Sequence, residues 1–477
     1  MFWGRKRELG RLRDELDAVV QSGQGAMLAL RGRRQSGKSR LLAEFVERAG
    51  VPYLFTTAVK NAPSDVQLQT VADDLHTART PLPALDTAFA ANPASWADLF
   101  ARLPLAFDGQ PAVVVLDEFP WATETDDTLE GTLQAAWDRT FEQLPVLWVV
   151  VGSDMAMMER LTEHDRPLYG RAREMIVTAL SPAEVAAAVG DRDPVDVTDV
   201  YLATGGYPRL VSAAAEHRDA ATFVHAQLSD DTSPLMVTGQ RILSSEFRDA
   251  ESVRAVLEAI GSVEVGHATF SSAVGLLGGD EKAAGAAVAR ALKPLQAKRL
   301  VAIDTPVGAG PKSKLRRYRI VDPYLRFFFR FCQPELAHVE QGRADLARAR
   351  FDRDYSSWRG RAVEPVVHAA VAQLAAGGDG RFGDVEQVGS WWDRSNNHEF
   401  DLVAAGRTGK ISWVGSVKWR SGRPMNQRDL GALAKARAVV PGAQEARLLA
   451  VCPAGEDVDA GFNGVLVAGD IVGAFAG

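Results

Sequence analysis

Four residues near the start of the chain have the types and the spacing that bind phosphate groups. Gly32, Gly37, Lys38 and Ser39 fit the pattern G-x-x-x-x-G-K-[ST]. Glycines let the backbone turn its N–H groups toward an anion, the lysine carries charge to the outer phosphates, and the serine hydroxyl can ligate Mg²⁺. The segment predicts a phosphate-binding loop (P-loop) for ATP, with Lys38 as a catalytic cation and Ser39 as a metal ligand.

The residues on both sides of this loop have the pattern that it needs. Residues 26–30 form an apolar run typical of a buried strand, and apolar residues then recur at helical spacing until Gly50 can cap the helix. The loop is therefore expected to join a strand to a helix N-terminus. We expect the nucleotide to contact Gly32, Arg33, Arg34, Gln35, Ser36, Gly37, Lys38, Ser39 and Arg40.

An acidic pair, Asp117 and Glu118, follows a second apolar run at residues 112–116. Both carboxylates should lie at the carboxyl edge of a parallel sheet, beside the P-loop. Asp117 is expected to hold Mg²⁺, and Glu118 is expected to polarise the attacking water. A helix N-cap would explain Asp117 taken alone, but the P-loop favours the metal site.

Two further residues are candidates for contact with the terminal phosphate. Ser153 follows the apolar run 146–151, the place of a sensor residue when an extra strand separates the P-loop strand from the acidic strand. A helix N-cap explains it almost as well. Arg171 is a candidate arginine finger, although most surface arginines have no such role. A finger that acts in trans would require a homo-oligomer.

Composition and periodicity limit the class of protein. The 477 residues suggest about three domains, and 46% hydrophobic with 24% charged residues is ordinary for a globular chain. A net charge of −7 argues against coating nucleic acid over the whole surface. Two cysteines cannot form a disulfide framework. Because no apolar run could cross a bilayer and no signal-peptide core is present, we expect a cytoplasmic location and no membrane partner.

Strand candidates at 26–30, 53–57, 112–116, 146–151 and 175–177 alternate with helical stretches. This alternation predicts an α/β fold, a P-loop NTPase of the ASCE or AAA+-like type with a parallel sheet. Three helical segments and two short strands follow, the outline of a winged helix-turn-helix. The expected domains are 1–235, including a helical lid from about 181 to 235, then 236–335 for the winged helix and 336–477 for a last α/β domain.

The predicted winged helix is strongly basic. Between Arg290 and Arg330 it has eleven Lys or Arg against two Asp. We expect its third helix to enter a major groove of duplex DNA while the wing contacts phosphates. The alternatives are a solvated charged face and a module that contacts another part of the protein.

The last domain has the remains of a metal site. Asp401 on one strand and Lys418 at the end of the next are arranged as in restriction-endonuclease-like folds. The further carboxylate is Glu364, near the start of a helix predicted at 360–374, or Glu399. Ser416 stands where the second carboxylate of such a site is expected. With one firm carboxylate a divalent ion should bind weakly, so we expect an inactive domain retained for binding or packing.

Taken together, these segments resemble the archaeal-type P-loop ATPase family, which is related to the AAA+ and STAND groups. The resemblance rests on FWGRKREL (2–9), GRRQSGKS (32–39), VVVLDEF (113–119), VVGSDMAMME (150–159), PLYGR (167–171), TGGYPRL (204–210), YRIVDPYLRFFFRF (318–331) and GSVKW (415–419). It implies an ATPase joined to a winged helix and a nuclease-like domain, with Gly4 and Arg5 near the nucleotide base.

Three functions are consistent with these residues. The first is an ATP hydrolase that uses ATP and Mg²⁺ to rearrange its other domains, with duplex DNA as a partner. The second is a STAND-like switch that holds ATP, seldom hydrolyses it and binds a protein partner that the sequence does not identify. The third is a Mg²⁺-dependent nuclease, which the missing carboxylate disfavours.

Overall fold

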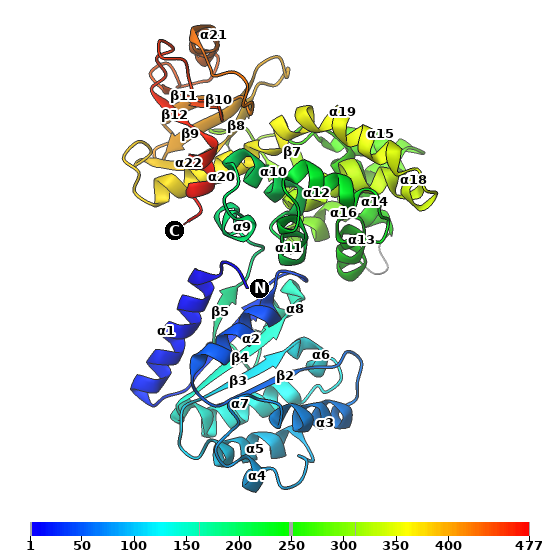
Figure 1. Cartoon of the computed structure of the whole chain (residues 1–477), viewed down its shortest axis with the longest axis vertical. Helices are drawn as coiled ribbons and strands as arrows, with labels where there is room; N and C mark the ends of the chain where they lie inside the picture. The colour runs from blue at the N-terminus through cyan, green and yellow to red at the C-terminus, as the bar shows by residue number, and fades with distance from the viewer. Residues whose placement is uncertain (1, 162, 248–250, 311, 477) are drawn as a thin grey trace. The chain divides into compact units, whose positions relative to one another are not determined.

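The computed structural model describes residues 2–161, 163–247, 251–310 and 312–476, which divide into two compact units, Met1–Ala179 and Leu180–Gly477. The first unit is built on a five-stranded parallel sheet in the order β2-β3-β4-β1-β5 (Figure 1). Its elements are α1 (Lys6–Ser22), β1 (Ala26–Arg31), α2 (Lys38–Ala49), β2 (Tyr53–Thr57), α3 (Ser64–Leu75), α4 (Leu85–Ala88), α5 (Trp96–Phe107), β3 (Ala112–Asp117), α6 (Phe119–Thr123), α7 (Leu129–Arg139), η1 (Phe141–Gln143), β4 (Val146–Gly152), α8 (Met155–Leu161) and β5 (Ala172–Ile176).

Helices cover both faces of this sheet, and its strands are therefore apolar on both sides. In β1, Met27 and Ala29 belong to the core cluster that contains the apolar residues of α5 and α7, while Leu28 and Leu30 belong to the cluster of α1 and α2. The predicted P-loop NTPase sheet is confirmed, including a strand, β4, between the P-loop strand β1 and the acidic strand β3. The last predicted strand begins earlier than expected, at Ala172.

The second unit combines helices, a hairpin and a mixed sheet. Its elements are α9 (Pro182–Val189), α10 (Pro194–Thr204), α11 (Pro208–Ala215), α12 (Ala220–Gln227), α13 (Pro234–Glu246), α14 (Glu251–Ser262), α15 (Phe270–Leu277), α16 (Glu281–Ala297), β6 (Val301–Asp304), β7 (Arg317–Ile320), α17 (Pro323–Phe327), η2 (Phe328–Cys332), η3 (Gln333–Glu335), α18 (Leu336–Glu340), α19 (Ala344–Ala362), α20 (Glu364–Ala376), β8 (Val385–Trp392), β9 (Glu399–Gly406), β10 (Ile411–Val417), α21 (Gln427–Arg437), β11 (Arg447–Val451), β12 (Gly464–Leu466) and α22 (Ala468–Gly473).

The predicted order of three helices and an antiparallel hairpin is present as α14, α15, α16 and β6–β7. The last sheet has the order β12-β11-β10-β9-β8, with antiparallel pairs at β8–β9 and β9–β10 and parallel pairs beyond. The single helix predicted at 360–374 is instead two helices, since α19 ends at Ala362 and α20 begins at Glu364. Pro365 follows in the first turn of α20, where the missing N–H of proline is tolerated.

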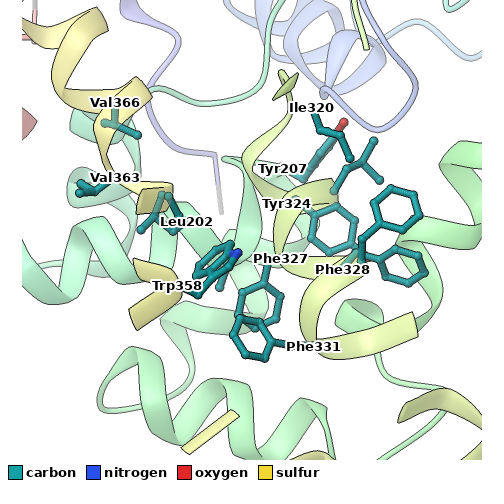
Figure 2. Close-up of a cluster of buried hydrophobic side chains, with 14 of the residues drawn as sticks. Leu202, Tyr207, Ile320, Tyr324, Phe327, Phe328, Phe331, Trp358, Val363 and Val366 are labelled. Carbon is teal, nitrogen blue, oxygen red and sulfur yellow. The ribbon is translucent and has the colours of Figure 1, made fainter. Parts of the chain in front are cut away.

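The segment predicted as a lid, 181–235, packs within the second unit. Its apolar residues share one core cluster with the hairpin, α17 and α19 (Figure 2). Tyr207 donates a hydrogen bond from its hydroxyl to Asp322 (2.5 Å), and the hydroxyl of Tyr324 donates to the carbonyl of Leu235 (2.8 Å). The compact division therefore lies at residue 179, ahead of the predicted domain boundary at 235. The domain boundaries themselves stay a prediction.

Candidate active site

The P-loop joins β1 to α2, as predicted. Two of its residues have positive φ, Gln35 at 64° and Gly37 at 90°, and Gly37 caps the N-terminus of α2. A Cβ on Gly32 would lie 2.2 Å from the carbonyl oxygen of Val177, so only glycine fits at the start of the loop. The buried Ser36 Oγ and Gln35 Oε1 have no hydrogen-bond partner among the described residues. The loop thus has the tight turn and the spare polar atoms of a ligand cradle.

Lys38 lies inside this loop. Its ammonium donates to the carbonyl oxygens of Gly32 (2.8 Å) and Arg33 (3.2 Å), and its side chain is buried. A buried cation needs such acceptors when no anion is bound. A phosphate oxygen could replace them, which fits the predicted role of Lys38.

The predicted metal ligands are in contact. Ser39 Oγ donates to Asp117 Oδ2 at 2.5 Å, and Asp117 Oδ1 accepts from the backbone N–H of Glu118 at 3.0 Å. These atoms meet because β3 ends at Asp117, at the same edge of the sheet where β1 enters the P-loop. A hydroxyl and a carboxylate are the hard oxygen donors that Mg²⁺ prefers, so the pair fits this ion.

Glu118 and Ser153 form a second pair at this edge. Glu118 has a left-handed backbone (φ 52°), and its Oε2 accepts hydrogen bonds from Ser153 Oγ (2.9 Å) and Ser153 N–H (3.2 Å). Ser153 directly follows β4, which lies beside β3. A non-glycine residue with positive φ at such a site indicates backbone strain that the surrounding contacts maintain. The serine thus fixes the orientation of the glutamate, while its contact with a phosphate stays a prediction.

Arg5 has a structural task that the sequence did not indicate. The residue is 2% exposed, and its guanidinium donates to the carbonyl oxygens of Ser36 (2.6 Å) and Thr178 (2.7 Å), and to Glu8 (2.9 Å). The residue therefore ties the N-terminal segment to the P-loop and to the end of the sheet. Gly4, with φ 65°, turns the chain just before it. A position near the nucleotide base stays a prediction for both residues.

The remaining loop arginines point to different surroundings. Arg40 is exposed on α2 and pairs only weakly with Glu44 (3.4 Å). Arg34 lies over the ring of Trp121, with its Cζ 5.7 Å from the ring centroid. Lys60 contacts the same ring, with its Nζ 5.6 Å from the centroid. Neither Lys60 nor Trp121 was predicted from the sequence to lie here. Both follow strands that end at this edge, β2 and β3, and that position is the signal that could have found them.

Arg171 does not lie with this site, which corrects its assignment as a finger for the P-loop of its own chain. It precedes β5, whose first residue, Ala172, pairs with Met27 at the start of β1. At about 3.3 Å per residue the P-loop begins about 16 Å further along the strand direction. The guanidinium makes a two-pronged contact with Asp138 (2.7 Å to each oxygen) and also donates to the carbonyl of Pro167 (3.0 Å). Its hydrogen bonds therefore stabilise the amino edge of the sheet.

We expect Arg171→Ala to change the kcat for ATP by no more than about twofold in the monomeric chain, because surface ion pairs stabilise by only about 0–1 kcal/mol. Steady-state hydrolysis at low protein concentration measures this. Asp138→Ala removes the same ion pair and serves as the matched control. A loss of activity in Arg171→Ala alone that grows with protein concentration would instead indicate a finger in trans.

The predicted nuclease residues lie in the second unit, where an arginine occupies the carboxylate cluster. Arg361 Nη1 is 3.1 Å from Glu364 Oε1, 3.3 Å from Glu399 Oε1 and 3.7 Å from Asp401 Oδ1. Lys418 is exposed at the end of β10. In the described part of the chain no three His, Cys, Asp or Glu side chains are grouped to hold a metal ion. The carboxylates therefore hold a guanidinium in the position expected for a cation.

Asp401 is also engaged on its other oxygen. Its Oδ2 accepts from the N–H of Val417 (2.9 Å) and from Ser416 Oγ (3.2 Å), the residue that replaces the expected second carboxylate. Burial, together with the negative charge of Asp401, raises the pKa of Glu364 to about 8. At neutral pH, below this pKa, Glu364 is therefore mainly protonated. The sequence analysis missed Arg361, although its i, i+3 spacing from Glu364 places both on one side of the helical segment.

This shift makes the stability of the chain depend on pH. Between the ordinary carboxyl pKa of 4.5 and about 8, the folded state binds a proton that the unfolded state lacks, so the free energy of unfolding falls as pH rises. We expect a loss of about 2 kcal/mol from about pH 6.5 to about pH 8, and Glu364→Gln should remove most of it. This pH range lies above the raised pKa of Asp199, about 6, so the titration of Asp199 contributes little to the change. Urea unfolding of wild type, Glu364→Gln and the exposed control Glu386→Gln measures the slope; equal slopes in all three would contradict the assignment.

A glycine-bounded phosphate loop on a parallel sheet, with Ser39 against Asp117 and Glu118 against Ser153 at the same edge, defines the site of a P-loop nucleoside triphosphatase. Residues 2–213 match the family described as an ATPase domain predominantly from Archaea. The part of the chain that contains this site is therefore an archaeal-type P-loop ATPase domain, an ATP hydrolase. Residues 328–430 match a second family, described as archaeal and bacterial proteins of unknown function.

Individual relatives are distant. The chain is 22% identical over 422 residues to the uncharacterized protein MJECL04 of Methanocaldococcus jannaschii, and the match covers 88% of each chain. Similar solved structures include the Walker-type ATPase PABY2304 of Pyrococcus abyssi (17% identity, TM-score 0.47, 69% of this chain and 96% of that one). The ORC2 protein of Aeropyrum pernix in ADPNP-ADP complexes is another (16% identity, TM-score 0.41, 73% and 95%). None of the described helices combines the length and apolar character of a membrane span.

Proposed function

We propose that Mg²⁺-dependent ATP hydrolysis in the first unit rearranges the second unit, and that duplex DNA is the effector. The observation that carries the hydrolytic part is the meeting of the Ser39–Asp117 and Glu118–Ser153 pairs at one sheet edge with the P-loop. This arrangement supports the proposal, because phosphoryl transfer requires phosphate-binding residues, a metal site and a general base in one place.

Each residue of the site has a defined task in this proposal. Lys38 would exchange its loop carbonyls for phosphate oxygens, and Ser39 with Asp117 would hold Mg²⁺, which when bound neutralises charge on the phosphates. Glu118 would accept a proton from the attacking water as the water oxygen bonds to the terminal phosphorus and the bond from that phosphorus to the bridging oxygen breaks, releasing ADP. Ser153 keeps the Glu118 carboxylate in one orientation by donating to it, and Arg5 keeps the loop in place from behind.

The DNA part of the proposal is supported by a smaller basic surface than the sequence suggested. Of the eleven basic residues from 290 to 330, five are buried or half-buried: Lys298, Arg317, Arg319, Arg326 and Arg330. Four of these pair with carboxylates, namely Glu246, Glu399, Asp304 and Asp354. These five residues therefore contribute little to the exposed surface of the predicted basic patch. Six remain exposed, on or just after α16 and in the loop between β6 and β7: Arg290, Lys293, Arg299, Lys312, Lys314 and Arg316.

This surface fits the interpretation of the segment as a winged helix-turn-helix, in which the third helix and the hairpin loop approach DNA. Exposed Lys and Arg supply the phosphate contacts on which such binding depends. The carboxylate cluster filled by Arg361 gives no support to the alternative of a Mg²⁺-dependent nuclease.

Steady-state ATP hydrolysis with Mg²⁺, with and without duplex DNA, tests the proposal. We expect stimulation by DNA that the double variant Lys312→Gln/Lys314→Gln weakens about tenfold or more, because each lost phosphate contact lowers affinity. The control Arg407→Gln/Lys410→Gln removes equal charge from the exposed turn between β9 and β10. Turnover that DNA leaves unchanged would reject DNA as the effector. Tight ATP binding with negligible turnover would favour the nucleotide-gated switch and a protein partner.

A further inference from the structure

Arg326 on α17 is a buried cation without an ordinary partner. Its side chain is 4% exposed, and neither Nε nor Nη1 has a hydrogen-bond partner among the described residues. The neighbouring arginines differ, since Arg319 makes two hydrogen bonds to Asp304 (2.6 and 3.0 Å) and Arg317 pairs with Glu399 (3.2 Å). A buried guanidinium without hydrogen bonds is destabilising, so its presence requires a reason outside folding.

The surrounding core fixes this guanidinium in place. Tyr324 and Phe327, on either side of Arg326 in the sequence, are fully buried in the cluster that Figure 2 shows, together with Phe328 and Phe331. The hydroxyl of Tyr324 donates to Leu235 and accepts from the N–H of Gly239 (2.6 Å), which anchors α17 to α13. The helix therefore cannot turn to carry Arg326 into solvent, and the charge is held ready for a ligand.

Arg326 lines a cavity of about 520 Å³ within the second unit. The hairpin β6–β7, the start of α20 and strand β8 form its walls, and apolar side chains such as Val307, Val366 and Val388 contribute to them. This volume lies in the range of small-molecule sites. Asp401 and Lys418, two of the predicted nuclease residues, do not line the cavity, although Glu364 does.

The charges around the cavity favour an anion. Its acidic residues are already engaged, Asp304 by Arg319 and Glu399 by Arg317, and the third, Glu364, is mainly protonated at neutral pH. Burial and the nearby charge of Arg319 lower the pKa of Arg326 to about 10, so the residue remains charged at neutral pH but is destabilised by its surroundings. A bound dianion would offset both the cost of burying the Arg326 charge and its repulsion by Arg319.

We propose that this cavity binds a small phosphate-bearing molecule, with the phosphate on Arg326 and the remainder against the apolar walls. A phosphate group has enough acceptor oxygens for the free Nε and Nη1 donors and favours the planar fork of arginine. The backbone of duplex DNA fits less well, because the buried Arg326, inside a cavity, is out of reach of a phosphate on a rigid helix. This site is independent of the ATP site of the first unit.

Equilibrium dialysis of the full chain with radiolabelled inorganic phosphate, and separately with AMP, tests the proposal. Lys38→Ala serves as the parent so that the P-loop does not capture the probe. We expect one saturable site that Arg326→Met weakens about tenfold or more and that the matched control Arg330→Met retains, since Arg330 lies outside the cavity. Equal affinity for both probes would identify inorganic phosphate as sufficient, and tighter AMP binding would identify a phosphate ester with an organic body.

Thermal unfolding separates a binding role from a structural one. The ligand-free Arg326→Met chain should melt at the same temperature as its parent or higher, because an unpaired buried charge is removed, and phosphate should no longer raise that temperature. If Arg326→Met does not fold, Arg326→Lys retains the charge without the fork and should still weaken phosphate binding. The absence of saturable binding of either probe to the parent, undiminished binding in the Arg326 variants, or displacement of the probe by duplex DNA would overturn the proposal.

Discussion

Lys38→Ala is expected to reduce ATP turnover to below about one hundredth of the wild-type rate, because an electrostatic contact to developing charge is removed in a desolvated site. The buried ammonium donates to the carbonyls of Gly32 and Arg33, and both lie within the loop that would surround the phosphates. Both ground-state binding and turnover should therefore suffer, so that the Kd for ATP rises as kcat falls. Isothermal titration with a non-hydrolysable ATP analogue and a steady-state assay measure the two effects.

Arg48→Ala is the matched control for this variant. Arg48 lies in the last turn of α2, ten residues from Lys38, is exposed, and contacts Glu44 at its own helix surface. The control should therefore retain nearly full activity, and circular dichroism of both variants should show an unchanged helix content. Wild-type turnover in Lys38→Ala would exclude this loop as the place of hydrolysis.

The contacts at the candidate active site that could be predicted from sequence are those governed by local pattern and by sheet topology. Gly32, Gly37, Lys38 and Ser39 are close in the sequence, and their loop conformation follows from residue types. Asp117 and Ser153 are remote from them, yet parallel strands place all of their carboxyl ends at one edge. The contact of Ser39 with Asp117 was thus predictable from two apolar runs and the polar residues that follow them.

The assignments that failed depend on which end of a strand a residue occupies and on distant partners. Arg171 directly precedes β5, and this position places it at the amino edge of the sheet. Because the strand was predicted to begin at residue 175, the sequence did not show that Arg171 lies directly before it. The basic segment 290–330 does not form a uniformly exposed patch. Carboxylates far away in the sequence pair with several of its residues, such as Glu399 with Arg317 and Asp354 with Arg330. No local sequence pattern predicts such ion pairs, because each partner, considered alone, looks like an ordinary exposed charged residue.

The same limit applies to the Arg361 cluster. A sequence pattern showed which ligand was absent, Ser416 in place of an acid, but not which cation had replaced the metal. Arg361 becomes informative only when α19, α20 and β9 bring it together with Glu364, Glu399 and Asp401. A missing metal ligand can therefore be recognised from the sequence more easily than the side chain that occupies the site in place of a metal ion.

Glu118→Gln is expected to lower kcat by about 10²- to 10⁴-fold, the range typical of a lost general base, while ATP binding stays within about threefold of wild type. The glutamine keeps the size of the side chain and can still accept from Ser153 through its amide oxygen, so the local geometry should persist. What it lacks is the ability to take a proton from water. The expected result is a split between kcat and Kd, which differs from the combined loss expected at Lys38.

Ser153→Ala separates orientation from proton transfer at this site. The variant removes one of the two hydrogen bonds that hold Glu118 but leaves the bond from the backbone N–H of residue 153. We expect a loss in kcat of about tenfold, well below that of Glu118→Gln, since a partly constrained base still reaches its water. If Glu118→Gln retained most of the wild-type kcat while binding ATP normally, another group would have to accept the proton, and the strained backbone at Glu118 would then serve only to position α6 and the adjoining loop.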